Sequence, residues 1–378
     1  MPNPFVYGEI VPPEAFVDRA EELRRLTADL EAGQKVFLIS PRRYGKSSLI
    51  RRALAAMARR GALVTETTVS SCSSYVAFLE AYARALVAAD VEQRRARDWI
   101  LSALRPLRPD VRPEAAGRAP VVRFPPARSD RDVSRLAAEI FALPARLAQA
   151  RRRRVVVALD EFQAVAAFDG GAVEHALRAA VQHQRDVGYV FAGSEPSLME
   201  RMIGPRRPFY KAGPVMRLEK IPAAEFAAFI ESAFRRTRIA PDADLGASIV
   251  ELAGNVPFDV QRLAHETWDD VRASGRRRAT LDDLHAALGR LLTEQQAVFE
   301  ALWQRLTLAQ RAVLRAVVFE DGRELLSADV RIRRRLPGAS TVQAALAALQ
   351  REDLVAREGD RYTVVDSLLR EWVARKTF

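Results

Sequence analysis

The sequence predicts an α/β protein: a parallel-sheet domain over residues 1–221, a helical domain over 222–292 and a winged helix over 293–378. Three observations predict this order. Short apolar runs alternate with amphipathic helical patterns up to residue 221, as in parallel sheets that helices cover on both faces. The pattern then becomes wholly helical. A small unit of helix, helix, helix and two strands begins at about Leu306.

The elements of the first domain follow from periodicity and from helix-breaking residues. The first strand is expected at residues 35–40 (KVFLIS), and a helix runs from Lys46 to Arg60, where Gly61 closes it. Further strands are expected at 62–69, 155–160, 188–194 and 215–221, and further helices at 74–105, 134–154 and 171–186. The proline- and arginine-rich residues 106–128 are expected to form a surface loop.

Composition excludes several classes of protein. The chain has 378 residues, and no apolar run reaches the roughly 18 residues that a membrane helix requires. The N-terminal residues lack the basic and apolar regions of a secretion signal, so a cytoplasmic protein is expected. Cys72 is the only cysteine, which excludes an internal disulfide and a cysteine-based zinc site.

The charge balance favours a polyanionic partner. The net charge is +11 and the pI is about 10.3, which favours DNA. Arginine outnumbers lysine by 54 to 5, however, so part of this charge can reflect a genome-wide preference for arginine. The same ratio gives weight to Lys46, because a lysine in this background indicates a need for a compact ammonium group.

The segment SPRRYGKSSL, residues 40–49, follows the first predicted strand and matches the phosphate-loop pattern G-x-x-x-x-G-K-[ST] except at Ser40. In this pattern Gly45 permits close backbone approach, Lys46 reaches the β- and γ-phosphates, and the Ser47 hydroxyl binds Mg²⁺. Ser40 lies at the turn into the loop, and Pro41 stiffens the next step. The substitution is therefore expected to change the entrance to the loop and to leave the site for ATP and Mg²⁺ intact.

The amides that cradle the phosphates are expected mainly from Tyr44 to Ser48, at the start of a helix whose dipole attracts anions. The residues expected to bind nucleotide in this loop are Ser40, Pro41, Arg42, Arg43, Tyr44, Gly45, Lys46, Ser47 and Ser48.

A second motif, VVVALDEFQ, supplies two carboxylates at the end of a predicted strand. Asp160 is expected to hold Mg²⁺, and Glu161 to orient or deprotonate the attacking water. Ligands bind at this edge in open α/β sheets, and together the two motifs predict a nucleotide triphosphatase. Ser194, at the end of YVFAGS, could sense the γ-phosphate, or it could be an ordinary strand-terminal serine.

These motifs resemble, in order along nearly the whole chain, the archaeal-type ATPase family, a branch of the AAA+ superfamily near the STAND and origin-recognition-like P-loop ATPases. The other segments that carry the resemblance are FVDRAEELRRL, RPFYKAGPVMRLEKI, GNVPFDVQRLAHETW and RYTVVDSLLREWV. The serine at the loop entrance is itself typical of the family. The resemblance implies an AAA+-like P-loop NTPase core with a helical lid, and an ATPase that converts ATP and water to ADP and phosphate.

The resemblance also implies roles for residues outside the two motifs. Phe16 and Arg19 match the segment that covers the adenine, and Pro257 matches a lid proline near the base. Arg262 matches a second sensor arginine, with an exposed helical arginine as the alternative. Gln163 is a family hallmark for which no role beyond a polar contact at the γ-phosphate is argued.

Arg206 and Arg207 stand where AAA+ proteins often place an arginine finger that acts on a neighbouring subunit. Such an arginine stabilises charge on the transferring phosphoryl group, so these two residues are catalytic candidates alongside Glu161 and Lys46. This role requires a homo-oligomer. A solvated loop is the alternative, and STAND proteins typically lack the finger.

The C-terminal unit reads as a winged helix whose third helix runs from Ser340 to about Arg351. Ser340, Thr341 and Gln343 lie at its N-terminal end, where base edges are usually read. The basic run RIRRR (331–335) could contact phosphates. Because the third helix is mostly alanine and leucine, DNA binding is expected to be backbone-led, with weak sequence specificity. A protein-interaction module is the alternative.

The sequence therefore predicts a Mg²⁺-dependent ATPase that couples its nucleotide state to DNA binding or remodelling through a winged helix. A STAND-like nucleotide switch, which controls protein assembly or signalling without DNA, stays open as the alternative. Assembly into a homo-oligomer also stays open, and no membrane partner is expected.

Overall fold

The computed structural model describes residues 2–8, 17, 19–89, 110–112, 121–125, 129–168 and 171–376. These residues form two compact units. The core unit is Arg19–Glu219, and the C-terminal unit is Met1–Asp18 with Lys220–Phe378. Each unit contains its own cluster of buried apolar side chains. No described helix combines the length and the apolar character needed to span a bilayer.

A parallel sheet forms the centre of the core unit. Its strands are β1 (Lys35–Ile39), β2 (Leu63–Thr68), β5 (Val155–Asp160), β6 (Val187–Gly193) and β7 (Val215–Arg217). Their order is β2-β5-β6-β1-β7, and every neighbouring pair is parallel. Every residue of β5 and β6 is buried, as expected for strands with both faces covered. The predicted α/β class is confirmed, although β7 ends four residues before the predicted strand end.

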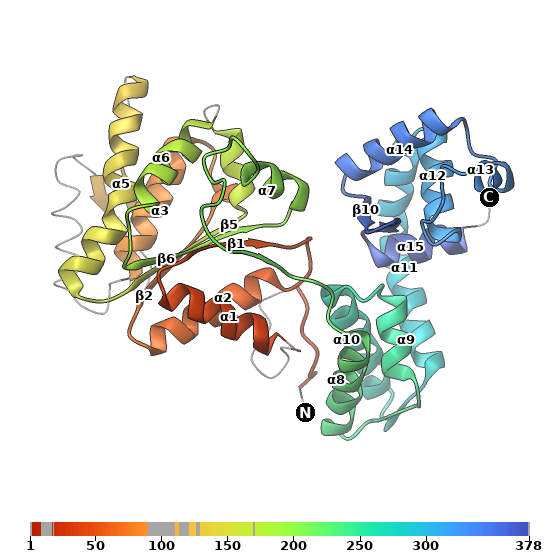
Figure 1. The fold of residues 1–378 in the computed structure, drawn as a ribbon. Coiled ribbons are helices and arrows are strands. Elements are labelled where there is room, and N and C mark those ends of the chain that lie inside the picture. The colour runs from red at the N-terminus through yellow and green to blue at the C-terminus, as the bar shows by residue number, and fades with distance from the viewer. Residues whose placement is uncertain are drawn as a thin grey trace. The chain divides into compact units, whose positions relative to one another are not determined.

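Helices cover both faces of this sheet (Figure 1). One face carries α1 (Ala20–Glu31) and α2 (Lys46–Arg59), and the other carries α3 (Tyr75–Ala89), α5 (Asp130–Arg151) and α6 (Ala172–Val181). The helix α7 (Pro196–Met202) and the 3₁₀ helices η2 (Val69–Ser71) and η4 (Phe162–Ala167) complete the described helices of this unit. The long helix α5 begins where the Ser129 hydroxyl accepts the Asp132 N–H.

Residues 106–128 are expected to form a surface loop, but two short segments within them form strands. The strands β3 (Asp110–Arg112) and β4 (Val121–Arg123) pair antiparallel. Val122 is fully buried, and the Phe124 N–H donates to the Glu80 carboxylate at 2.9 Å. Apolar residues among the prolines therefore anchor this segment on α3. The remainder of the predicted loop, and of the helix predicted beyond Ala89, lies outside the described residues.

The first part of the C-terminal unit contains α8 (Ala223–Arg236), α9 (Leu245–Leu252), α10 (Pro257–Ala273) and α11 (Leu281–Arg305). Two-residue strands, β8 (Ala240–Pro241) and β9 (Arg278–Ala279), pair with each other between these helices. The prediction that this region is wholly helical is therefore wrong at these residues. The N-terminal residues pack on α10. The Asn3 side chain donates to the His265 carbonyl at 3.1 Å, and the Tyr7 hydroxyl donates to Glu266 at 2.7 Å.

The rest of this unit is a winged helix, as predicted. It comprises α12 (Leu308–Phe319), α13 (Ala328–Arg333), α14 (Ala339–Arg351), the wing strands β10 (Val355–Glu358) and β11 (Arg361–Val364), and α15 (Ser367–Arg375). Gly322, after α12, lies directly against the wing, because an added Cβ would come within 1.7 Å of the Tyr362 carbonyl oxygen. Only glycine therefore lets this turn pack against β11.

Candidate nucleotide-binding site

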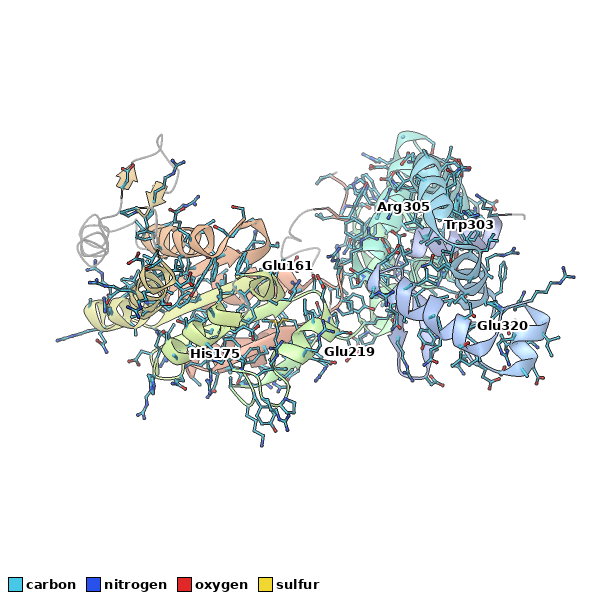
Figure 2. The ribbon with its side chains drawn as sticks, turned by 90° about the horizontal axis from the view of Figure 1, so that it is seen from above. Glu161, His175, Glu219, Trp303, Arg305 and Glu320 are labelled. Atoms are coloured by element: carbon cyan, nitrogen blue, oxygen red, sulfur yellow. The ribbon has the colours of Figure 1, made fainter. Side chains whose placement is uncertain are left out.

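The candidate site lies at the carboxyl edge of the sheet, where three neighbouring strands end. The segment 40–45 follows β1, Asp160 ends β5, and Ser194 follows β6. Because β5, β6 and β1 are adjacent and parallel, their carboxyl ends meet at one edge, the usual ligand-binding edge of open α/β sheets. Glu161 comes directly after β5 and is labelled in Figure 2.

Ser40 continues the sheet and does not make the turn into the loop. Its N–H donates to the Gly193 carbonyl at 3.2 Å, and its hydroxyl donates to the Pro41 carbonyl at 3.1 Å. The left-handed backbone positions come later, at Arg43 (φ 69°) and Gly45 (φ 83°). This explains physically why the loop needs no glycine at position 40.

The loop leaves room for a phosphate group. A Cβ added at Gly45 would meet no atom within 4 Å, and α2 begins at the next residue. The first N–H groups of a helix have no partner within it, and together with the helix dipole they attract anions. Tyr44 and Ser48 are buried beside the loop, whereas Arg42 and Arg43 are exposed. The residues present therefore fit a bound nucleotide phosphate.

Lys46, Asp160 and Glu161 form an ion cluster beneath the loop, in which Lys46 and Asp160 are buried and Glu161 is partly buried. The Lys46 Nζ lies 2.7 Å from Asp160 Oδ1 and 2.8 Å from Glu161 Oε1. The Ser47 hydroxyl donates to Asp160 Oδ2 at 2.8 Å. The residues Lys46 and Asp160 are each 6% exposed. One ammonium thus serves two carboxylates, and the side chains predicted to contact phosphate, metal and water lie together.

Glu161 is held from its other side as well. Its Oε2 accepts hydrogen bonds from the Ser194 hydroxyl at 2.5 Å and from Gln163 Nε2 at 2.6 Å. Burial raises the pKa of Glu161, but the hydrogen bonds from Lys46, Ser194 and Gln163, with the Lys46 charge, outweigh burial and lower that pKa. Glu161 is therefore a carboxylate at neutral pH, with Lys46 on one oxygen and two neutral donors on the other.

Gln163 is the site residue that the sequence patterns did not assign. Its side chain is 5% exposed, and its Oε1 accepts no hydrogen bond from any described residue. A Cβ at Gly193 would come within 2.7 Å of that oxygen, so Gly193 makes space for the amide. Glu161, two residues before Gln163, has a left-handed backbone conformation (φ 53°). No sequence motif encodes this conformation.

A cavity of about 630 Å³ opens beside Glu161. Gln163 and Ser194 contribute to its wall, as do Arg42 and Glu195, whose charged groups are 3.8 Å apart. The apolar side of this cavity comes from η4 and α7. Because Glu161 itself lines this cavity, water in the cavity can reach its carboxylate.

Two predicted adenine-covering residues have different outcomes. Arg19 is 5% exposed, and its Nη2 donates to the Glu219 carbonyl at 2.6 Å and to the Tyr44 carbonyl at 3.5 Å. The Arg19 side chain thus joins the phosphate loop to the end of the core unit. Phe16 lies outside the described residues.

Pro257 and Arg262, the predicted lid residues, belong to the C-terminal unit. Pro257 is the first residue of α10, a position that suits proline because no intrahelical N–H bond is lost there. Arg262 lies on the same helix and is partly buried, and its Nε has no hydrogen-bond partner among the described residues.

Arg206 and Arg207, the predicted finger residues, are exposed in the segment between α7 and β7. Within the described residues, neither forms an ion pair with the carboxylates of the site. Burial raises the pKa of Glu174, and the positive charge of Arg207 partly offsets that rise.

The winged helix presents less free charge than its sequence indicates. Ser340, Thr341 and Gln343 are exposed on α14, as predicted for base-reading positions. Arg333 and Arg334, however, both pair with Glu320, at 2.9 and 2.5 Å. In the same run, the Arg331 side chain donates to the Leu326 carbonyl at 3.2 Å. Of the four arginines in this run, Arg335 alone has no side-chain partner among the described residues.

Comparisons with known proteins agree with the fold of both units. A family model described as an ATPase domain predominantly from Archaea matches residues 16–263, and one described as a probable winged helix domain matches residues 297–375. No curated protein sequence matches the chain.

Several solved structures share the fold. The Walker-type ATPase PABY2304 of Pyrococcus abyssi is 16% identical, with a TM-score of 0.63 over 97% of this chain and 99% of that one. The ORC2 protein of Aeropyrum pernix, solved as ADPNP–ADP complexes, is 15% identical with a TM-score of 0.55, over 97% and 95%. The ORC1 protein of Aeropyrum pernix, solved in complex with DNA, is 14% identical with a TM-score of 0.52, over 97% and 95%. At these identities the likeness shows the fold.

Proposed function

Because the chain belongs to the family of ATPase domains found predominantly in Archaea, we propose that it binds ATP with Mg²⁺, hydrolyses it, and couples its nucleotide state to DNA binding. The single observation that carries the ATPase proposal is the buried cluster in which the Lys46 ammonium contacts both Asp160 and Glu161 under an open phosphate loop. Isolated buried charges are costly, so such a cluster is expected where ligand binding uses it.

Each member of the cluster has a distinct proposed role. The Lys46 ammonium would bind the β- and γ-phosphates, with the amides of the loop around it. The Ser47 hydroxyl and the Asp160 carboxylate, already 2.8 Å apart, would hold Mg²⁺. When bound, Mg²⁺ neutralises developing charge on the phosphate oxygens. Binding of nucleotide would thus draw Lys46 away from the two carboxylates.

Glu161 would then act as the general base. Once Lys46 contacts phosphate, Glu161 Oε1 is free to accept a proton from water in the adjoining cavity. Its Oε2 stays bonded to Ser194 and Gln163, which fix the plane of the carboxylate. Ser194 would therefore act on the γ-phosphate through Glu161, and Gln163 would be a positioning residue.

The remaining predicted site residues keep their proposed roles. Arg206 or Arg207, both exposed, would reach a neighbouring subunit in a homo-oligomer. Pro257 and Arg262 would contact the nucleotide from the lid, and Phe16 would cover the base. Arg19 would transmit changes in the phosphate loop, since it bonds to both the Tyr44 and the Glu219 carbonyls.

DNA is the partner that net charge, the winged helix and a related fold support. The chain carries +11, and the ORC1 protein with the same fold was solved with DNA. One observation favours the alternative, a switch that controls protein assembly. The exposed part of α14 is uncharged before Arg351, and Glu320 neutralises two nearby arginines, a surface that also suits a protein partner.

The test is the ATPase rate with and without single- and double-stranded DNA at several salt concentrations. Stimulation that fades with salt supports coupling to DNA, because phosphate contacts are salt-sensitive. Lys46→Ala and Glu161→Gln serve as controls. Hydrolysis that is undiminished in Lys46→Ala would refute the ATPase proposal, and absence of DNA binding at low salt would leave the assembly switch.

A further inference from the structure

The positive charge of the chain is segregated between its two units. The core unit holds 35 of the 59 lysines and arginines and 22 of the 48 acidic residues, a net charge of +13. The C-terminal unit, which contains the winged helix, holds 24 basic and 26 acidic residues, a net charge of −2. A genome-wide preference for arginine would act on both units alike, so it does not explain this difference.

Much of the core charge lies at the amino edge of the sheet, opposite the nucleotide site. Arg59 and Arg60 precede β2, Arg151–Arg154 precede β5, and Arg185 precedes β6. These three strands are adjacent and parallel, so the turns before them lie at one edge. The described acidic residues near the same edge are Asp29 and Glu31, in the last turn of α1, and Asp186.

Contacts between the turns show that these residues lie together. The Arg153 Nε donates to the Gly61 carbonyl at 2.6 Å, which joins the turn before β5 to the turn before β2. Gly33, before β1, lies directly against the Arg185 carbonyl oxygen. A Cβ added at Gly33 would also lie 3.3 Å from the guanidinium of Arg154. The edge is therefore one surface held by the sheet.

Three arginines of this edge are exposed and unpaired. Arg59, Arg152 and Arg185 come from three different turns, and none has a side-chain partner among the described residues. By contrast, Arg60 pairs with Glu31. Like charges that are not paired with the nearby carboxylates repel one another, and an anion that bridges them relieves this repulsion.

We propose that this amino edge, with Arg59, Arg152 and Arg185 at its centre, is a binding surface for the phosphate backbone of nucleic acid. Adjacent strands are about 4.8 Å apart, so the turns before β2, β5 and β6 span about 10 Å. DNA carries about one phosphate per 3.4 Å along each strand, so the edge faces about three phosphates. Guanidinium groups match phosphate oxygens in a two-pronged geometry that lysine lacks.

This inference rests on the proposed coupling to DNA, which identifies the polyanion as nucleic acid. It places most of the contacts to the phosphate backbone on the core unit, and the near-neutral α14 would add few. Because the edge lies opposite Lys46 and Glu161, nucleic acid and nucleotide would bind without competing for the same residues.

The test compares two triple variants of the full chain. One is Arg59→Gln, Arg152→Gln and Arg185→Gln; its matched control in the winged helix is Arg331→Gln, Arg335→Gln and Arg351→Gln. Binding of a fluorescent DNA duplex is measured by anisotropy from low to physiological salt. We expect the edge variant to flatten the plot of log affinity against log salt by about 3 units, and the control by less than about 1 unit.

The basal ATPase rate, without DNA, is expected to be unchanged in both variants. A slope that falls in the control but not in the edge variant would overturn the inference and leave the proposed function standing. An intact ATPase that binds no DNA at low salt would overturn both the inference and the DNA half of the proposed function. If polyglutamate binds the protein as tightly as DNA does, and the edge variant loses both affinities equally, the surface is assigned to acidic proteins. That result would also overturn the inference.

Discussion

Two ion clusters in this molecule each share one charged side chain between two of opposite charge, and they differ in how exposed their cations are. In the core unit, Lys46 is shared by Asp160 and Glu161 beneath the phosphate loop, and Lys46 is 6% exposed. In the winged helix, Glu320, labelled in Figure 2, is shared by Arg333 and Arg334. The two arginine side chains are 58% and 36% exposed, and the Glu320 side chain is 14% exposed. Distances are alike in the two clusters, so distance alone does not reveal function.

Burial makes the difference between the clusters. Desolvation of buried charges costs several kcal/mol for each ion, which only good partners or a ligand can offset. Surface pairs contribute about 0–1 kcal/mol and are screened by salt. Desolvation is therefore costly for the cluster around Lys46, whereas the cluster around Glu320 mainly holds two arginines in place.

The largest effect is expected from Lys46→Ala. Removal of the ammonium leaves the buried Asp160 and the partly buried Glu161 without their cation, so we expect hydrolysis to be lost and the free energy of unfolding to fall by about 3 kcal/mol. Urea unfolding of the nucleotide-free protein measures this. The double variant Lys46→Ala, Glu161→Gln is expected to recover part of the stability. If the wild type and Lys46→Ala are equally stable, Lys46 does not offset the cost of burying the two carboxylates, and this prediction is wrong.

The sequence predicts the strand ends within one residue except at β7, because buried parallel strands are continuous apolar runs. It also predicts the phosphate loop, because Gly45-Lys46-Ser47 has few other uses. It does not predict that Ser194 and Gln163 both bond to Glu161. Those contacts depend on the left-handed turn at Glu161 and on the missing side chain of Gly193, both set by packing.

The pairing of Arg333 and Arg334 with Glu320 is equally hidden from the sequence. Arg333 and Arg334 follow Glu320 by 13 and 14 positions, and only the turn between α12 and α13 brings them close to it. The basic run therefore looks freer in the sequence than it is in the structure.

An intermediate effect is expected from Gln163→Leu, which removes one donor from Glu161 at similar volume. We expect kcat to fall about tenfold with little change in KM, because the carboxylate is less well oriented. Since the Gln163 hydrogen bond lowers the pKa of Glu161, its loss shifts the acid limb of the pH–rate profile to higher pH.

The matched control for this change is Gln182→Leu, at an exposed glutamine after α6. A purely structural role for Gln163 would lower kcat without moving the acid limb. An unchanged limb in Gln163→Leu would therefore contradict its assignment as a positioning residue.

A smaller effect concerns stability against pH and salt. The pKa values of Glu161 and Glu320 are both lowered in the folded protein, Glu161 by its hydrogen bonds against opposing burial, and Glu320 chiefly by hydrogen bonds from Arg334 and Arg333. Each carboxylate therefore stabilises the fold above its unfolded pKa of about 4.3, and this contribution is lost as pH falls through the folded value.

Melting temperatures of Glu161→Gln and Glu320→Gln measured between pH 7 and pH 3 test this sign. Both variants are expected to lose less stability on acidification than the wild type does. High salt should abolish the difference for Glu320 and preserve it for Glu161, because the arginines that pair with Glu320 are exposed to screening ions whereas Lys46 is buried. The same salt response at both positions would remove the contrast between the clusters.

The smallest effect is expected from Glu320→Gln on DNA binding. The change frees Arg333 and Arg334 with little cost to stability. If the winged helix contacts phosphates, the salt dependence of DNA affinity steepens by up to about 2 units. If the core edge supplies the contacts, as we infer, the slope changes by less than about 1 unit.

The most direct test of the central claim is a comparison of ATP binding with single-turnover hydrolysis in Glu161→Gln. The amide keeps the shape of the side chain and removes the base. We predict that the variant binds Mg²⁺–ATP at least as tightly as the wild type and that its single-turnover rate falls by at least about 100-fold. A single-turnover rate equal to that of the wild type would contradict the assignment of Glu161, and with it the account of the buried cluster as a hydrolytic site.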